Sequence, residues 1–184
     1  MSHRICPWWL GYVLLVPVRR LWQDPHAILT PYVTEGMTVL EPGPGMGFFS
    51  LELARLVGPA GRVIAIDVQP KMLARLRIRA ERAGLDGRIE TRQATKSGLG
   101  IGDLAEKVDF VLAFAVVHEL PDRHVFFAEM AKAIVPGGRL LLAEPRHVSE
   151  EELEKTIDAA AAAGLRVTER PAIRGSRTAL LVRQ

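Results

Sequence analysis

The chain has 184 residues, of which 48% are hydrophobic and 24% are charged, and it contains a single cysteine. The apolar share is large enough for a continuous core, which excludes a wholly disordered chain and favours one main domain. Cys6 alone cannot form a disulfide framework or a thiolate-built metal site, so a reducing, cytoplasmic location is expected. The 24 Lys and Arg against 21 Asp and Glu give a net charge of +3. Because no basic tract offers cations to a row of phosphates, a nucleic-acid partner is not expected.

An uninterrupted apolar stretch, residues 5–18, lies near the N-terminus. It is shorter than the roughly 20 residues that span a bilayer, and its two prolines fit a secretory signal poorly. We expect the N-terminal segment, residues 1–24, to form an apolar lid over the substrate. The alternatives are an interfacial segment that makes peripheral membrane contact through residues 5–20, with Trp8 and Trp9 among the lipid headgroups, or burial against a second subunit in a homodimer.

From residue 25 onward, strand-like and helix-like patterns alternate along the chain. The expected elements are a helix over 25–34, a strand over 37–43, a helix over 48–58, a strand over 62–68, a helix over 70–84, strands over 88–94 and 108–116, a helix over 121–138, a strand over 139–145, a helix over 149–164, and strands over 165–173 and 178–184. This alternation predicts parallel strands with helical crossovers. The last two strands have no helix between them and should pair as an antiparallel hairpin.

The segment after the first expected strand carries alternating glycines, Gly43, Gly45 and Gly47, and leads into a helix. Glycine is needed where the backbone takes positive φ or approaches a ligand closely. The carboxyl end of a strand in an open α/β sheet is also where ligands bind. Three alternating glycines exceed what a tight turn needs, so we interpret this loop as a ligand site.

The loop does not match a dinucleotide fingerprint, which would place a third glycine where Phe48 stands. Pro44 also removes an amide donor that a pyrophosphate would use. Glu41 lies at the mouth of the loop, and a carboxylate there repels a phosphate, by about 1 kcal/mol even when partly solvated, but attracts an ammonium or sulfonium group. The pattern therefore favours a positively charged ligand.

A second acid, Asp67, ends the second expected strand. A carboxylate at this place can accept hydrogen bonds from both hydroxyls of a ribose. The alternative is that Asp67 caps the following helix. We favour the ribose role because residues 68–70 separate it from the helix.

The chain contains, in this order, the segments LEPGPGMG, AIDVQPKML, VDFVLAFAVVHELPD and VPGGRLLLAEP. With them, residues 25–184 resemble the class I S-adenosylmethionine-dependent methyltransferases, and within that superfamily the small-molecule branch that includes ubiquinone/menaquinone and arsenite methyltransferases. The resemblance implies a doubly wound, Rossmann-like α/β fold: a seven-stranded sheet of order 3-2-1-4-5-7-6, with the seventh strand antiparallel and helices on both faces.

The resemblance also implies roles for particular residues. Glu41 and the glycine backbone should hold the methionine end of S-adenosylmethionine, and Asp67 its ribose. The remaining contacts fall on Val68 and Met72 at the adenine and on Ala113, Phe114 and Ala115 at the methionine moiety and methyl group. In the family, an acid after the third strand often binds the adenine amine. Here that place holds Ala94 and Thr95, whose hydroxyl or nearby backbone would have to substitute.

Two residues are candidates for a general base. His118 follows the fourth expected strand, and its ordinary pKa suits proton transfer near neutral pH. Its alternative role is to pack beside the cofactor or cap the next helix. Glu144 ends the fifth expected strand, where it would either orient or deprotonate an acceptor or bond a nearby backbone amide. Asp122 is expected to cap the next helix. No metal site is expected, since the histidines lack ligand-like spacing.

The sequence argues against several classes of methyl acceptor. The fourth strand ends in AFAVVHEL, which lacks the Asn/Asp-Pro-Pro-aromatic signature of amide or adenine-amine methylation, and one cysteine cannot hold arsenite. We therefore expect in-line methyl transfer to a small, apolar or aromatic molecule. The alternatives are an S-adenosylmethionine-binding module without independent catalysis and an NAD-dependent oxidoreductase on a related sheet.

Overall fold

The computed structural model describes residues 22–95 and 98–184, and these two stretches form two compact units. The expected lid and the membrane contact through residues 5–20 lie outside the described residues. Within the described stretches, no helix has both the length and the apolar character needed to cross a membrane.

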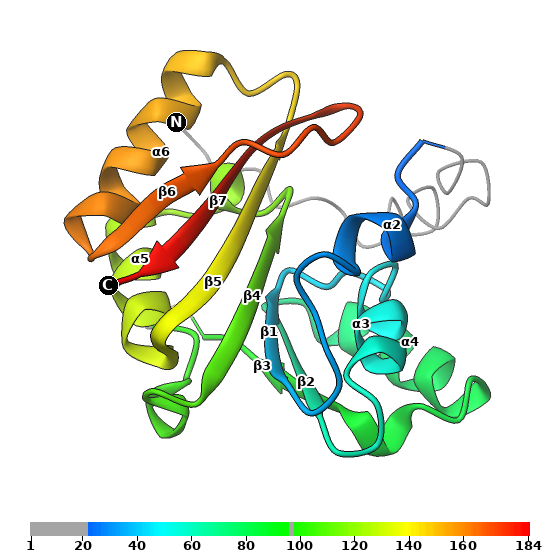
Figure 1. Ribbon diagram of the computed structural model, residues 1–184. Helices are drawn as coiled ribbons and strands as arrows, with labels where there is room; N and C mark the ends of the chain where they lie inside the picture. Colours follow the sequence, from blue (N-terminus) through cyan, green and yellow to red (C-terminus); the bar gives the residue numbers. More distant parts are fainter. Residues whose placement is uncertain (1–21, 96–97) are drawn as a thin grey trace. The chain divides into compact units, whose positions relative to one another are not determined.

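The unit over 22–95 alternates helices with three parallel strands (Figure 1). Its elements are α2 (Pro25–Leu29), β1 (Thr38–Pro42), α3 (Ser50–Leu56), β2 (Arg62–Asp67), α4 (Pro70–Arg82), the 3-10 turn η2 (Asp86–Arg88) and β3 (Ile89–Gln93). Leu40 pairs with Ile64 in the β1–β2 ladder, and both are fully buried. Because α3 and α4 contact β2, its central residues must be apolar on both faces, which is why it has no polar alternation.

The unit over 98–184 contains the other four strands. Its elements are the 3-10 turn η3 (Gly102–Leu104), β4 (Val108–Phe114), the 3-10 turn η4 (Val117–Glu119), α5 (Arg123–Ala133), β5 (Ile134–Pro145), α6 (Glu150–Ala162), β6 (Leu165–Glu169) and β7 (Ser176–Arg183). β4 and β5 are parallel, whereas β7 runs antiparallel to both β5 and β6. In Figure 1, α6 runs alongside the β6–β7 hairpin that it contacts.

The seven strands have the order β3-β2-β1-β4-β5-β7-β6, with β7 antiparallel. This confirms the predicted fold class, a Rossmann-like α/β sheet with packed helices, and it confirms the closing hairpin.

Two predicted helices were too long. α2 ends at Leu29, before the expected residue 34, because Pro31 has no amide with which to continue the helix. α5 ends at Ala133 instead of running to 138, and β5 begins at Ile134, which pairs with Val108. Pro136 disfavours helical backbone at the residue before it, so the chain enters the strand earlier than the apolar pattern indicated.

Candidate functional site

The loop between β1 and α3 is built on glycine backbone geometry. Gly43, Gly45 and Gly47 have φ of +68°, +55° and +83°, which residues with a side chain rarely adopt. The Gly43 amide donates to the Ile66 carbonyl at 2.8 Å, and the Gly47 amide donates to the Pro44 carbonyl at 2.9 Å. The loop is therefore a fixed turn whose glycines have positive φ, and its interpretation as a ligand site stays a prediction.

Gly45 and Gly47 differ in what surrounds them. A Cβ on Gly47 would lie 2.3 Å from Leu76 Cδ1, so the loop packs directly on α4 at this point. Among the residues that the structure describes, a Cβ on Gly45 would meet no atom within 4 Å. Gly47 is thus needed for packing, whereas Gly45 leaves open space beside the backbone, as a loop that admits a ligand requires.

The loop also has an anchor that the sequence did not reveal. Arg79 on α4 donates from Nη1 to the Met46 carbonyl, and the Met46 side chain is buried. No sequence signal links these residues, because they lie 33 positions apart and Arg79 is one of several arginines on its helix.

Glu41 lies near the end of β1 with only 3% of its surface exposed. Ser50, the first residue of α3, donates from Oγ to Glu41 Oε2 at 2.5 Å. Burial raises the pKa of Glu41 to about 7, against the lowering effect of the Ser50 bond, and the Asp67 carboxyl adds to the rise. A cation beside this carboxyl would relieve that burial penalty, so the site fits a positively charged ligand.

Asp67 ends β2, and its Oδ1 accepts a hydrogen bond from the Gln69 amide at 2.8 Å. This bond forms a turn ahead of α4, whose N-cap is Gln69, so Asp67 is not the cap itself. Val68 is 46% exposed, whereas Met72 is buried. The Ala94 amide donates to the Asp67 carbonyl at 3.0 Å, which brings the end of β3 beside Asp67, and Thr95 follows on the surface.

In the second unit, β4 ends in a strained turn. Ala113 is fully buried, Phe114 is half-buried, and Ala115 has φ of +55°. The Ala115 amide donates to the Ala143 carbonyl of β5 at 2.7 Å. This turn redirects the chain into η4 and so places His118 beside the end of β5.

His118 and Glu144 form a pair. Glu144 is 1% exposed; its Oε1 accepts the Val117 amide at 2.9 Å, and its Oε2 contacts His118 Nδ1. Of the two roles predicted for Glu144, the bond to a backbone amide is present, at Val117, and its role toward an acceptor stays a prediction. The contact with His118 was not predicted. The His147 ring packs edge-on against the His118 ring, with 5.4 Å between centroids.

This pairing determines what His118 can do. A carboxylate only accepts hydrogen bonds, so the proton on the neutral imidazole sits on Nδ1 and Nε2 is left as the acceptor. The hydrogen bond to Glu144 raises the pKa of His118, against the effect of partial burial. The other ring nitrogen, Nε2, lies 4.0 Å from Glu119 Oε1. Asp122, as predicted, caps α5 by accepting the amides of His124 and Val125 at 2.8 and 3.1 Å.

Known proteins were compared with the chain. Residues 33–170 match the family described as a methyltransferase domain. The ubiquinone/menaquinone biosynthesis C-methyltransferase UbiE of Klebsiella pneumoniae is 31% identical over 142 residues, 77% of this chain and 55% of that protein. A ribosomal protein L11 methyltransferase of Pelotomaculum thermopropionicum is 35% identical over 144 residues, 78% of this chain and 42% of that protein. The chain spans about half the length of the curated relatives it matches.

Among solved structures, a SAM-dependent methyltransferase from Aquifex aeolicus superposes with a TM-score of 0.84 at 25% identity. The superposition covers 97% of this chain and 98% of that one. These likenesses favour methyl transfer over the nicotinamide-dependent alternative. The chain therefore belongs to the methyltransferase domain family and is an S-adenosylmethionine-dependent methyltransferase domain.

Proposed function

We propose that the chain methylates a small acceptor with an apolar or aromatic body and an ionisable proton, and that His118 removes that proton. The observation that carries the proposal is the buried Glu144, which holds His118 Nδ1 and the Val117 amide together. A carboxylate that is 1% exposed, with one oxygen held by a backbone amide and the other at an imidazole, is the arrangement that orients a general base. The name of the UbiE relative, a C-methyltransferase of quinone biosynthesis, supports a small-molecule acceptor.

Each unit has its own proposed cofactor contacts. In the first, Glu41 and the amides of Gly43, Gly45 and Gly47 would receive the methionine end, and Asp67 the ribose. Val68 and Met72 would lie at the adenine, with Ala94 and Thr95 near its amine. In the second, Ala113, Phe114 and Ala115 would border the methyl group. The burial of Glu41 and the exposure of Val68 support these roles, since a buried acid seeks a cation and an exposed apolar side chain suits a stacked base.

When bound, S-adenosylmethionine supplies a methyl group already activated by its sulfonium. His118 would take the acceptor's proton at Nε2 as the acceptor atom bonds to the methyl carbon, and the electron pair of the broken C–S bond would remain on sulfur. Glu144 would then stabilise the imidazolium through Nδ1. Alignment of the acceptor would supply most of the rate, and proton removal about a further 100-fold.

The test begins with acceptor discovery: the full chain is incubated with methyl-labelled S-adenosylmethionine and a panel of phenols, quinols and amines. With an accepted phenol or quinol, we expect His118→Gln to lower kcat by about 100-fold and to change S-adenosylhomocysteine affinity little. His124→Gln is the matched control, because His124 is exposed and only its backbone amide is bonded to Asp122. Unchanged turnover in the His118 variant would refute the role of this residue as a base.

A further inference from the structure

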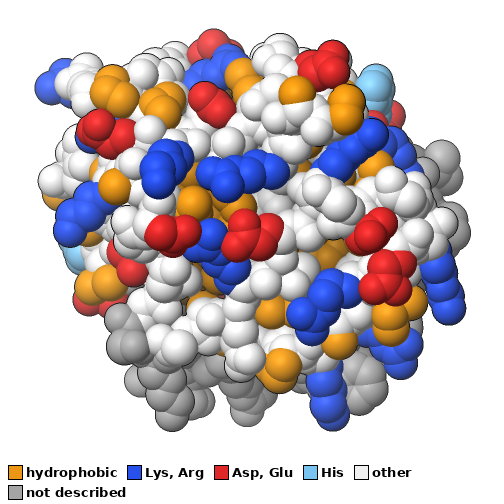
Figure 2. Space-filling model, turned by 90° about the horizontal axis from the view of Figure 1, so that it is seen from below, with side chains coloured by type: hydrophobic (Ala, Val, Ile, Leu, Met, Phe, Trp, Pro, Cys, Tyr) orange, Lys and Arg blue, Asp and Glu red, His pale blue; other side chains and the backbone are white. Residues whose placement is uncertain are grey.

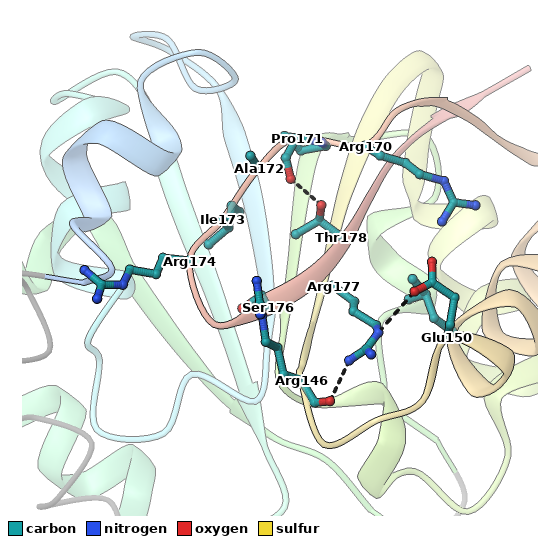
Figure 3. A pocket seen from close by; sticks show the side chains of 11 residues that line it. Arg146, Glu150, Arg170, Pro171, Ala172, Ile173, Arg174, Ser176, Arg177 and Thr178 are labelled. Atoms are coloured by element: carbon teal, nitrogen blue, oxygen red, sulfur yellow. Dashed lines mark hydrogen bonds and ion pairs between the residues drawn. The ribbon is translucent and has the colours of Figure 1, made fainter.

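A cavity of about 510 Å³ lies in the second unit, between the N-terminal end of α6, the segment after β5 and the loop that joins β6 to β7. Ligand pockets of about 300–1,000 Å³ hold small molecules, so the cavity is larger than a single ion needs. Figure 3 shows Arg146 extending from the end of β5 toward the β6–β7 loop, with Arg177 reaching from β7 toward α6.

The lining is strongly cationic. It contains four arginines, Arg146, Arg170, Arg174 and Arg177, and one acid, Glu150. On the face drawn in Figure 2, by contrast, Lys and Arg side chains are interleaved with Asp and Glu. In Figure 3 the Arg174 side chain points away from the other labelled residues, whereas Arg146 and Arg177 lie among them. Guanidinium groups at a cavity create a positive potential that attracts oxyanions.

Arg170 and Arg177 form ion pairs with acidic side chains. Arg170 pairs with Glu154 at 2.8 Å outside the cavity. Arg177 lies 3.5 Å from Glu150 and donates to the Arg146 carbonyl at 2.5 Å. Arg146 differs: among the residues that the structure describes, its guanidinium has no carboxylate partner, although its carbonyl is held by Arg177. A guanidinium whose backbone is fixed and whose fork remains available is suited to a carboxylate or phosphate.

The other part of the lining is apolar. Leu153 and Ile173 are 2% and 9% exposed, and Pro171 and Ala172 continue this wall along the loop. The Thr178 hydroxyl donates to the Pro171 carbonyl, which fixes the loop over β7. A cavity with guanidinium groups on one side and buried aliphatic side chains on another fits an oxyanion attached to an apolar body.

The segment that carries Arg146 also contacts the proposed base. Glu144 contacts His118, and His147 packs on the same ring, while Arg146 lies between them in sequence and lines the cavity. The four residues from Glu144 to His147 therefore join the arginine cavity to the His118 pair. The β5–β7 ladder fixes this segment, since Glu144 pairs with Arg177 and Pro145 with Ser176.

We infer that this cavity binds the carboxylate or phosphate of an acidic acceptor, with Arg146 as the specificity-determining residue. The inference rests on the proposed function, because it assigns the acceptor of the same site. The expected acceptor is then an apolar or aromatic acid, which is narrower than the apolar or aromatic molecule of the proposed function. The anionic group is held beside Arg146, and the atom to be methylated lies toward His118.

Binding is tested first, without cofactor, on the full chain by amide NMR. The probes are phenyl phosphate, benzoate and, as the neutral reference, benzyl alcohol. We expect saturable shifts confined to residues 146–150 and 171–178 with one or both anions and none with benzyl alcohol. Arg146→Met should weaken anion binding about tenfold, the lower end for a charged hydrogen bond because the site is open to solvent.

Arg166→Met is the matched control: Arg166 is an exposed arginine of β6 that does not line the cavity, and its loss changes the net charge equally. Arg146→Lys keeps the charge but loses the forked guanidinium, so its anion affinity should lie between those of wild type and Arg146→Met. An intermediate affinity also shows that the weaker binding of Arg146→Met is not a folding defect. Equal anion binding by wild type and both Arg146 variants, or equal binding of benzyl alcohol, would overturn the inference.

A second arm separates this inference from the proposed function. The ratio of kcat/KM for 4-hydroxybenzoate to that for phenol should exceed 1 and fall in Arg146→Met but not in Arg166→Met. If phenol is methylated as well as its acid and Arg146→Met changes neither, the inference fails while the proposed function stands. If the anions bind at the cavity and neither phenol nor any other acceptor is methylated, the cavity stands as an anion site and the proposed function fails.

Discussion

Burial and the proposed ligand favour opposite protonation states of the Glu41 carboxyl. Its carboxyl is 3% exposed, so the folded protein favours the protonated form, yet its proposed ligand calls for the charged form. The pKa of about 7 places the group between these states at neutral pH. A buried acid that opposes folding is expected where a side chain serves binding at the expense of stability.

The stability of the free protein should therefore depend on Glu41. Its folded pKa is raised from 4.5 to about 7, so between these values the folded state holds one proton that the unfolded state has lost. The free energy of unfolding therefore falls as pH rises from 4.5 to about 7, by about 3 kcal/mol over the whole range. We predict that Glu41→Gln raises the melting temperature at pH 8 much more than at pH 5, measured by calorimetry. An equal shift at both pH values would contradict the assignment.

The same carboxyl should couple cofactor binding to proton release. A cation beside Glu41 lowers its pKa, so S-adenosylhomocysteine, which carries an ammonium group, should bind more tightly as pH rises from 6 to 8. Titration calorimetry in buffers of different ionisation enthalpy measures the released proton. In Glu41→Gln we expect about tenfold weaker binding and a flat pH dependence. Proton release that persists in this variant would assign the effect to another group.

Two glycines of one loop should respond differently to the same substitution. Gly47→Ala places a Cβ 2.3 Å from Leu76 Cδ1 at a φ of +83°, so we predict a loss of about 2–4 kcal/mol in the free energy of unfolding. Gly45→Ala meets no atom of the described part of the chain within 4 Å and should lose only about 1 kcal/mol, while weakening cofactor binding. Urea unfolding of both variants checks this. If Gly45→Ala is the less stable of the two, the described packing of the loop on α4 is wrong.

At the scale of elements, α5 shows how a helix depends on its ends. Asp122 accepts two amides of the first turn, and Arg123 reaches across to α6, where it lies 3.0 Å from Glu152 and 3.1 Å from the Thr156 hydroxyl. The cap was visible in the sequence because it is local. The Arg123 contact was not, because it joins residues about 30 positions apart.

We predict that Asp122→Ala lowers the free energy of unfolding by about 1 kcal/mol, the usual effect of losing a cap. Because the hydrogen bonds of the Asp122 carboxylate within the described residues go to amides of α5, S-adenosylhomocysteine affinity should not change. Asp122→Asn, which keeps the capping oxygen, should recover most of the stability. Chemical denaturation and calorimetry give the two readouts, and a loss of cofactor affinity without a loss of stability would show a different role.

At the scale of the whole molecule, the N-terminal segment is proposed to supply an apolar lid. Its three tryptophans and one tyrosine, counted through Trp22, are unusual for a chain with 6% aromatic residues. We predict that deletion of residues 1–20 abolishes methyl transfer but leaves S-adenosylmethionine affinity measurable. If turnover survives the deletion, the lid proposal fails.

The sequence by itself determined the order of the elements, the glycine turn, the acids at the ends of β1 and β2, and the closing hairpin. Each of these depends on residues that lie close together in the chain or on a regular period. It placed the end of α5 wrongly, since the influence of Pro136 on the preceding backbone competes with an apolar pattern that suits helix and strand equally.

Only the tertiary structure decided which of these residues act together. Burial raises the pKa of Glu41, and the β4–β5 ladder places Glu144 beside His118. Arg79 donates to the Met46 carbonyl, and three of the four cavity arginines lie on the β6–β7 loop and β7. These contacts join positions 26 to 33 residues apart, or elements that meet only when the sheet forms. Their chemistry depends on desolvation and on distance in space, which a linear pattern does not contain.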